Sequence, residues 1–111
     1  MAVTVKKLIA SQQVANSTTT YYTATNVKTI IDKFTVCNPT AGAATIIVYL
    51  VDSGGSAGDS ETIISAKSVG AGETYTFPEI VGHTLNASDF IQCIASAATT
   101  LTLRASGREI T

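Results

Sequence analysis

The residues that could carry acid–base or metal chemistry are few and scattered along this chain of 111 residues. His83 is the only histidine and lies in a loop-like segment, so a metal site with two histidine ligands is excluded. A catalytic serine or cysteine needs a base beside it, and none here lies in a recognisable nucleophile motif. The sequence therefore predicts no catalytic residues, and we expect a protein that is not an enzyme.

Carboxylates gather around a Gly/Ser-rich segment, Ser53–Ser60 (SGGSAGDS). Asp52 and Asp59 are seven residues apart, whereas calcium loops place their oxygen ligands much closer together. The glycine run from Gly54 to Gly58 is not followed by the Gly-Lys-Ser/Thr of a phosphate-binding loop. This segment predicts an exposed, flexible loop, and we expect the protein to use neither a metal nor a cofactor.

Cysteines and tyrosines complete the set of candidate groups. Cys37 and Cys93 each lie in a β-like run, where they would pack as buried thiols; a disulfide between neighbouring strands is the alternative. Exposed tyrosines could stack on sugars, or they could close the rim of a hydrophobic core. The four tyrosines are Tyr21, Tyr22, Tyr49 and Tyr75.

Composition and charge exclude two classes of partner. Seven basic residues against eight acidic ones leave no basic footprint, so we expect no nucleic-acid partner. No apolar run approaches the roughly 18 residues that a membrane helix requires. The N-terminal stretch has Lys6 and Lys7 inside its apolar part, which is the wrong order for a signal peptide, so we expect no membrane association and no export.

Short β-branched runs separated by Gly, Ser and Asn turns are the dominant pattern, and they predict an all-β protein. Ala44–Asp52 is nearly apolar throughout, which predicts a central strand covered on both sides. Gly70-Ala71-Gly72 predicts a tight hairpin containing a glycine with positive φ. The predicted strands are Val3–Ala10, Tyr21–Ala24, Lys28–Asn38, Ala44–Asp52, Glu61–Val69, Glu73–Phe77, Asp89–Ala95 and Thr100–Ile110.

No amphipathic helix is available to cover an open sheet, so we expect a single antiparallel β-sandwich, jelly-roll-like, with about eight strands. Residues 1–27 read as an N-terminal strand and an extended polar arm, and residues 28–111 as the sandwich domain. Partner contacts are expected on Val3–Thr20 and on Ser53–Ser60. The predicted core is Ile30, Phe34, Val36, Ile46, Val48, Leu50, Ile63, Phe77, Phe90, Ile94, Leu101 and Leu103.

From Lys28 to the C-terminus, the order of features resembles small β-sandwich virion proteins of tailed bacteriophages. The resemblance is one of pattern and involves no catalytic motif. It is carried by Lys28-Thr29-Ile30-Ile31, Val36-Cys37-Asn38-Pro39-Thr40, Val48-Tyr49-Leu50-Val51-Asp52-Ser53-Gly54-Gly55-Ser56, Gly70-Ala71-Gly72-Glu73-Thr74-Tyr75 and the closing segment from Leu101 to Thr111.

The resemblance implies a virion protein of the capsid decoration (cement), head-fibre, or neck and tail accessory type. We expect a decoration protein that is made in the host cytoplasm, joins the virion, binds the major capsid protein lattice or other virion proteins, and stabilises the head. Self-association as a homo-oligomer, a dimer or trimer, is expected as well. A neck, tail or fibre-base component and a carbohydrate-binding β-sandwich module are the alternatives.

Overall fold

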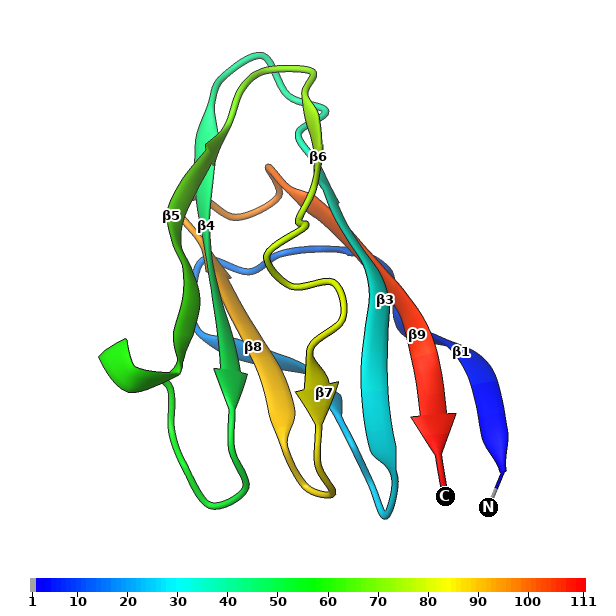
Figure 1. The fold of residues 1–111 in the computed structure, drawn as a ribbon. Helices are drawn as coiled ribbons and strands as arrows, with labels where there is room; N and C mark the ends of the chain where they lie inside the picture. Colours follow the sequence, from blue (N-terminus) through cyan, green and yellow to red (C-terminus); the bar gives the residue numbers. More distant parts are fainter. Residues whose placement is uncertain (1) are drawn as a thin grey trace.

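The computed structural model describes residues 2–111, and their strands form two antiparallel sheets that pack face to face (Figure 1). The only helical element in this range is a 3-10 turn, η1 (Asp59–Glu61). The strands are β1 (Val3–Gln13), β2 (Thr19–Thr23), β3 (Lys28–Cys37), β4 (Ala44–Val51), β5 (Thr62–Val69), β6 (Thr74–Thr76), β7 (Thr84–Leu85), β8 (Phe90–Ala95) and β9 (Thr102–Ile110).

The strand order is that of a jelly roll. Sheet A has the order β1-β9-β3-β6, and β7 also pairs with β3; sheet B has the order β2-β8-β4-β5. When β6 and β7 are counted as one interrupted strand, each sheet holds four strands, and the chain crosses repeatedly from one sheet to the other. The predicted all-β, jelly-roll-like sandwich is confirmed.

Period-two patterns explain how these strands build a core between the sheets. In β8, Ile91, Cys93 and Ala95 are buried and alternate with half-buried residues, because successive strand side chains point to opposite faces. Most of the predicted core is confirmed. The predicted residues that are fully buried are Phe34, Val36, Ile46, Val48, Phe77, Leu101 and Leu103.

Five residues of the predicted core lie elsewhere. Leu50 is only half-buried, although it packs against the core. Phe90 and Ile94 are half-buried and belong to the outer face of sheet B, because their neighbours in β8 point inward. Ile63 is 37% exposed, and a bulge in the pairing of β4 with β5 turns Ile64 inward in its place.

A second bulge explains the error at Ile30. The register of β3 against β9 shifts between Ile31 and Lys33, so Asp32 is the extra residue. This shift turns Ile31 and Phe34 inward, and Ile30 is left outward and half-buried. Asp32 then forms a two-point ion pair with Arg108 on the outer face, at 3.0 Å for each contact.

The predicted N-terminal arm and the boundary between residues 27 and 28 are wrong. β1 pairs with β9 along sheet A, and β2 pairs with β8 in sheet B. Leu8, Ile9 and Val14 are buried in the same core as the later strands. Strand pairing supplies hydrogen-bond partners for the backbone of this segment. Its polar residues lie on the exposed sides of β1 and β2 and in the connection between these strands. Residues 2–111 therefore form one domain.

The predicted hairpin at Gly70-Ala71-Gly72 is also wrong, although Gly72 does have a positive φ of +72°. β5 belongs to sheet B and β6 to sheet A, so this turn crosses between the sheets. The buried Asn38 holds the crossing. Its backbone N–H donates to Glu73 O at 2.8 Å, and its side-chain amide donates to Val69 O at 2.9 Å.

Candidate functional site

The fold does not bring the predicted chemical groups together. Within residues 2–111, no three His, Cys, Asp or Glu side chains lie close enough to hold a metal ion. His83 is exposed in the connection before β7. Cys37 is half-buried on β3 of sheet A, and Cys93 is buried on β8 of sheet B. Both thiols are free, so the disulfide alternative is wrong, and burial raises the pKa of Cys93 well above its ordinary value.

The tyrosines do not share a surface. Tyr22 is buried, and Tyr21 packs against the core. The ring of Tyr75 lies under the amine of Lys67, at 4.5 Å from its centroid. Tyr49 is left as the one tyrosine on the outer face of sheet B among the described residues. A row of rings that could stack on a sugar is therefore not formed.

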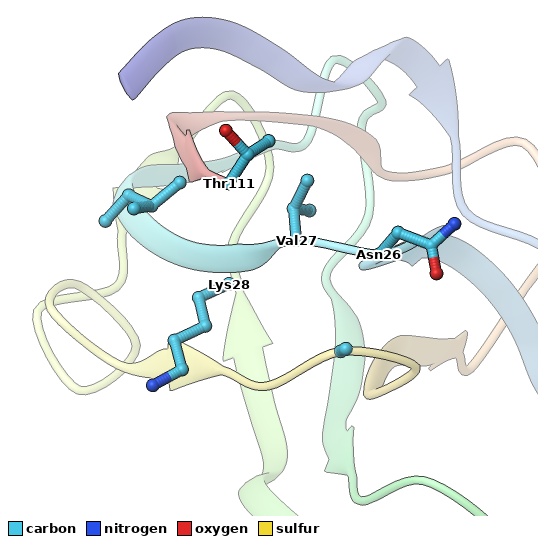
Figure 2. Close-up of a pocket in the computed structure, with 6 residues that line it drawn as sticks. Asn26, Val27, Lys28 and Thr111 are labelled. Carbon is cyan, nitrogen blue, oxygen red and sulfur yellow. The ribbon is translucent and has the colours of Figure 1, made fainter. Parts of the chain in front are cut away.

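An open hollow of about 470 Å3 lies where the turn before β3 meets the end of β9 (Figure 2). Val27, Ile110 and Ala87 make its lining largely apolar. The side chain of Lys28, its one charged residue, extends away from Val27 and Thr111 in Figure 2. No acid–base pair lines this hollow, so its lining provides mainly apolar surface and no arrangement of groups for catalysis.

A hydrogen-bonded chain of polar side chains links the two sheets. Tyr22 of β2 donates its hydroxyl to Glu109 of β9 at 2.5 Å, so the Thr29 hydroxyl, 2.7 Å away, must donate to Tyr22. Lys6 of β1 also contacts the Glu109 carboxylate, with its amine 3.3 Å from each oxygen. Burial, and then the bond to Glu109, raises the pKa of Tyr22 to about 12, while the bond from Tyr22 lowers the pKa of Glu109. Both shifts favour a neutral Tyr22 and a charged Glu109.

This chain predicts an alkaline loss of stability. The folded protein keeps the Tyr22 proton up to about pH 12, whereas the unfolded chain releases it near its ordinary pKa of 10.0. The free energy of unfolding should therefore fall by about 2 kcal/mol as the pH rises through this window. Tyr22→Phe should make that part of the curve less steep in urea titrations from pH 8 to 12, and the slope that remains is expected from the buried Cys93 thiol, whose pKa is also raised. An equally steep decline in the variant would contradict the assignment.

The most distinctive surface is the outer face of sheet B. Strands β2, β8 and β4 lie side by side, and none of them contains a charged residue. Ile47 lies directly opposite Ile94, and Tyr49 opposite Gln92. These side chains are half-buried and do not belong to the core. We call this surface, with Phe90, the uncharged face. It also corrects the prediction that Ala44–Asp52 is covered on both sides.

The outer face of sheet A differs in charge. Lys33 and Arg104 line a hollow of about 370 Å3 together with Thr35 and Ser106. The exposed ion pair between Asp32 and Arg108 lies on the same sheet. A partner that covers sheet A must therefore desolvate charged groups, which is costly, whereas a partner on the uncharged face need not.

The Ser53–Ser60 loop is exposed, as predicted, and has fixed attachments at its base. The carboxylate of Asp89 accepts hydrogen bonds from the backbone N–H groups of Ser53 and Asn86, each at 2.8 Å. Glu61 accepts one from the Asp52 N–H at 3.1 Å. The carboxylates of Asp89 and Glu61 therefore have a structural role, because each accepts hydrogen bonds from backbone N–H groups at the base of the loop.

Comparison with known proteins extends the fold assignment. No protein-family model matches the chain, and no curated protein matches it. A solved structure from work on Bacillus endospore appendages, described as a novel family of disulfide-linked pili, is similar with a TM-score of 0.53 and 17% identity. The similarity covers 98% of this chain and 88% of that one.

A chain in the structure of infectious bursal disease virus, Gx strain, is similar with a TM-score of 0.53 and 15% identity. The similarity covers 97% of this chain but only 30% of the viral chain, so this protein spans less than a third of that length. These likenesses show a common β-sandwich fold. None of the described segments forms a helix long and apolar enough to span a bilayer.

Proposed function

We propose that this protein is a structural component of a bacteriophage virion, of the capsid decoration (cement) type, that binds the major capsid protein lattice and stabilises the head. It acts by adhesion and not by catalysis, and it self-associates as a dimer or trimer. The observation that carries the proposal is the uncharged face. The resemblance to virion proteins of tailed bacteriophages and the sandwich fold found in a pilus and in a virus add support.

The uncharged face suits contact with another protein surface. Interface centres are poor in charged residues, because each buried charge must be desolvated. Ile47, Ile94 and Phe90 supply apolar area there, and Gln92 and Tyr49 supply polar groups that need no counter-ion. Each contact is small, but repetition on a symmetric particle multiplies modest interfaces into a strong hold.

A charge placed on this face is expected to weaken binding strongly without unfolding the protein. Ile94→Glu puts a carboxylate opposite Ile47, where a bound partner would have to desolvate it. Binding to undecorated heads should weaken by at least about tenfold, since burying an unpaired charge costs more than 1.4 kcal/mol. Lys33→Glu on sheet A is the matched control and should bind normally. Pull-down of each variant with purified heads measures the difference, and normal binding by Ile94→Glu would refute this role of the face.

Mass spectrometry of purified heads against purified tails tests the proposal as a whole. A decoration protein is present in heads in hundreds of copies, and its absence from heads would overturn the proposal. A dozen or fewer copies at the neck or tail would favour the neck, tail or fibre-base alternative. The carbohydrate-binding alternative has less support, because Tyr49 and Tyr75 lie on different sheets.

A further inference from the structure

One edge of sheet A is formed by β1, which among the described strands pairs only with β9; β6 and β7 form the other edge (Figure 1). From Val3 to Lys7 its register against β9 is continuous, and the irregularities begin only after Lys7. Native proteins normally interrupt or cover such an edge, because an unpaired regular strand is a template for another strand. The first half of β1 has neither a bulge nor a proline.

Alternation of the backbone groups shows which residues are available at this edge. The N–H of Thr111 donates to the carbonyl of Ala2 at 3.0 Å, so Ala2 faces β9. In an antiparallel ladder the direction alternates, so Thr4 and Lys6 also face β9, while Val3, Val5 and Lys7 direct their N–H and C=O groups to the free edge.

The same segment exposes apolar side chains. Val5 is 82% exposed and Val3 is 55% exposed, more than the other large hydrophobic residues of the described chain. Both lie on one face of β1, two residues apart. Val3 is next to Ile110 across the ladder, so apolar area continues into sheet A. The segment Val3–Lys7 therefore has both unpaired backbone groups and exposed valine side chains.

We propose that Val3–Lys7 pairs antiparallel with the same segment of a second copy of this chain, with Val5 opposite its own counterpart. This register places each Val3 opposite a Lys7. All three pairs then consist of residues whose backbone groups point outward, and they form roughly six hydrogen bonds. The result is a two-fold dimer in which the two copies of sheet A become one continuous sheet.

Charge selects this register. β1 contains two lysines and no acidic residue, so its partner segment must keep the lysines apart. A two-fold axis at Lys7 would place two ammonium groups opposite each other, and an axis at Val3 would leave Lys7 unpaired. With the axis at Val5, Lys6 lies opposite Thr4, and Lys6 is already neutralised by Glu109. The contact is short, so we expect a weak dimer that a particle reinforces.

This inference deepens the self-association in the proposed function and rests on that function only for its biological setting. Cysteine cross-linking of the isolated protein, in a Cys37→Ser background, tests the register. In Val5→Cys the two thiols face each other across a pair about 5.5 Å apart between Cα atoms, which suits a disulfide. In Val3→Cys, the matched control, the two thiols are offset by four residues, about 13 Å along the strand.

We expect Val5→Cys to form covalent dimers at least tenfold faster than Val3→Cys under mild oxidation. Equal rates, or no dimer from Val5→Cys, would overturn the proposal. Val5→Pro gives an independent measurement, because the Val5 N–H faces away from β9 and proline is tolerated there. The melting temperature of Val5→Pro should stay close to that of the parent protein. The sedimentation coefficient of the parent should rise with protein concentration, and that of Val5→Pro should not.

The outcome is separable from that of the proposed function. A monomeric protein that still binds heads would overturn only the edge pairing. A dimer linked through position 5 that is absent from purified heads would overturn only the decoration role. Concentration-dependent sedimentation that survives in Val5→Pro would show that another surface joins the copies, and it too would overturn the edge pairing.

Discussion

Replacing Gly107 by alanine is expected to destabilise the fold by about 3 kcal/mol or more, among the largest effects of any single methyl group in this protein. Gly107 lies in β9 between β1 and β3, opposite Lys6 and Ile31. A Cβ atom there would collide with the carbonyl oxygen of Ile30 and would lie 2.8 Å from Leu8 Cδ1. Relief would require the backbone of a neighbouring strand to move, which breaks ladder hydrogen bonds at the centre of sheet A.

The matched control is Gly42→Ala. Gly42 lies in the loop between β3 and β4, and an added Cβ meets no atom within 4 Å there. Since its φ is not positive, this substitution should change the free energy of unfolding by less than about 1 kcal/mol. Urea denaturation of the two variants beside the parent gives the comparison. Similar midpoints for both variants would show that sheet A tolerates a side chain at Gly107.

Local composition was sufficient to predict the strands and the class of fold. The predicted Ala44–Asp52 differs from β4 by one residue, and the predicted Asp89–Ala95 differs from β8 by one residue. Runs of β-branched residues bounded by Gly, Asn and Pro carry this information in a short stretch of sequence. Regular spacing of such runs, without an amphipathic helix, then leaves few architectures other than a sandwich.

The faces of the strands were harder to predict, because one bulge reverses every later side chain. In β3 the bulge at Asp32 makes Ile31, and not Ile30, a partner of Phe34 in the core. Which strand receives a bulge depends on the neighbouring strand, and that neighbour is distant in the sequence. The same reason explains the arm: β1 is held by β9, about a hundred residues further along the chain.

The uncharged face was partly visible in the sequence. The runs TTYYT, ATIIVYLV and FIQCIA contain no charge, but the runs are separated in the chain, and only the pairing of β2, β8 and β4 makes them one surface. Because β4 and β8 have apolar residues on both faces, the sequence pattern alone does not show which face of each strand points outward. For this reason the sequence predicts Phe90 and Ile94 in the core, whereas the structure places them on the outer face. The free edge of β1 required the strand order and could not be read locally.

A comparison of two phenylalanines, Phe34 on the inner face of sheet A and Phe90 on the outer face of sheet B, tests which of them belongs to the core. Phe34 is fully buried and packs edge-to-face on Phe77, with ring centroids 5.6 Å apart, so Phe34→Ala removes core volume and an aromatic contact. We expect a loss of about 3–5 kcal/mol and a fall in melting temperature of more than about 10 °C. Phe90→Ala removes a half-buried ring outside the core and should cost only about 1 kcal/mol.

The functional effects should have the opposite order. Below its lowered melting temperature Phe34→Ala is folded, and it should still bind heads because its surface is unchanged. Phe90→Ala should be stable but bind heads weakly, because it removes apolar area from the uncharged face. Calorimetry and head pull-down on the same samples give both readouts. If Phe90→Ala unfolds as readily as Phe34→Ala, Phe90 belongs to the core, and the outward apolar surface on which the proposed function depends would be lost.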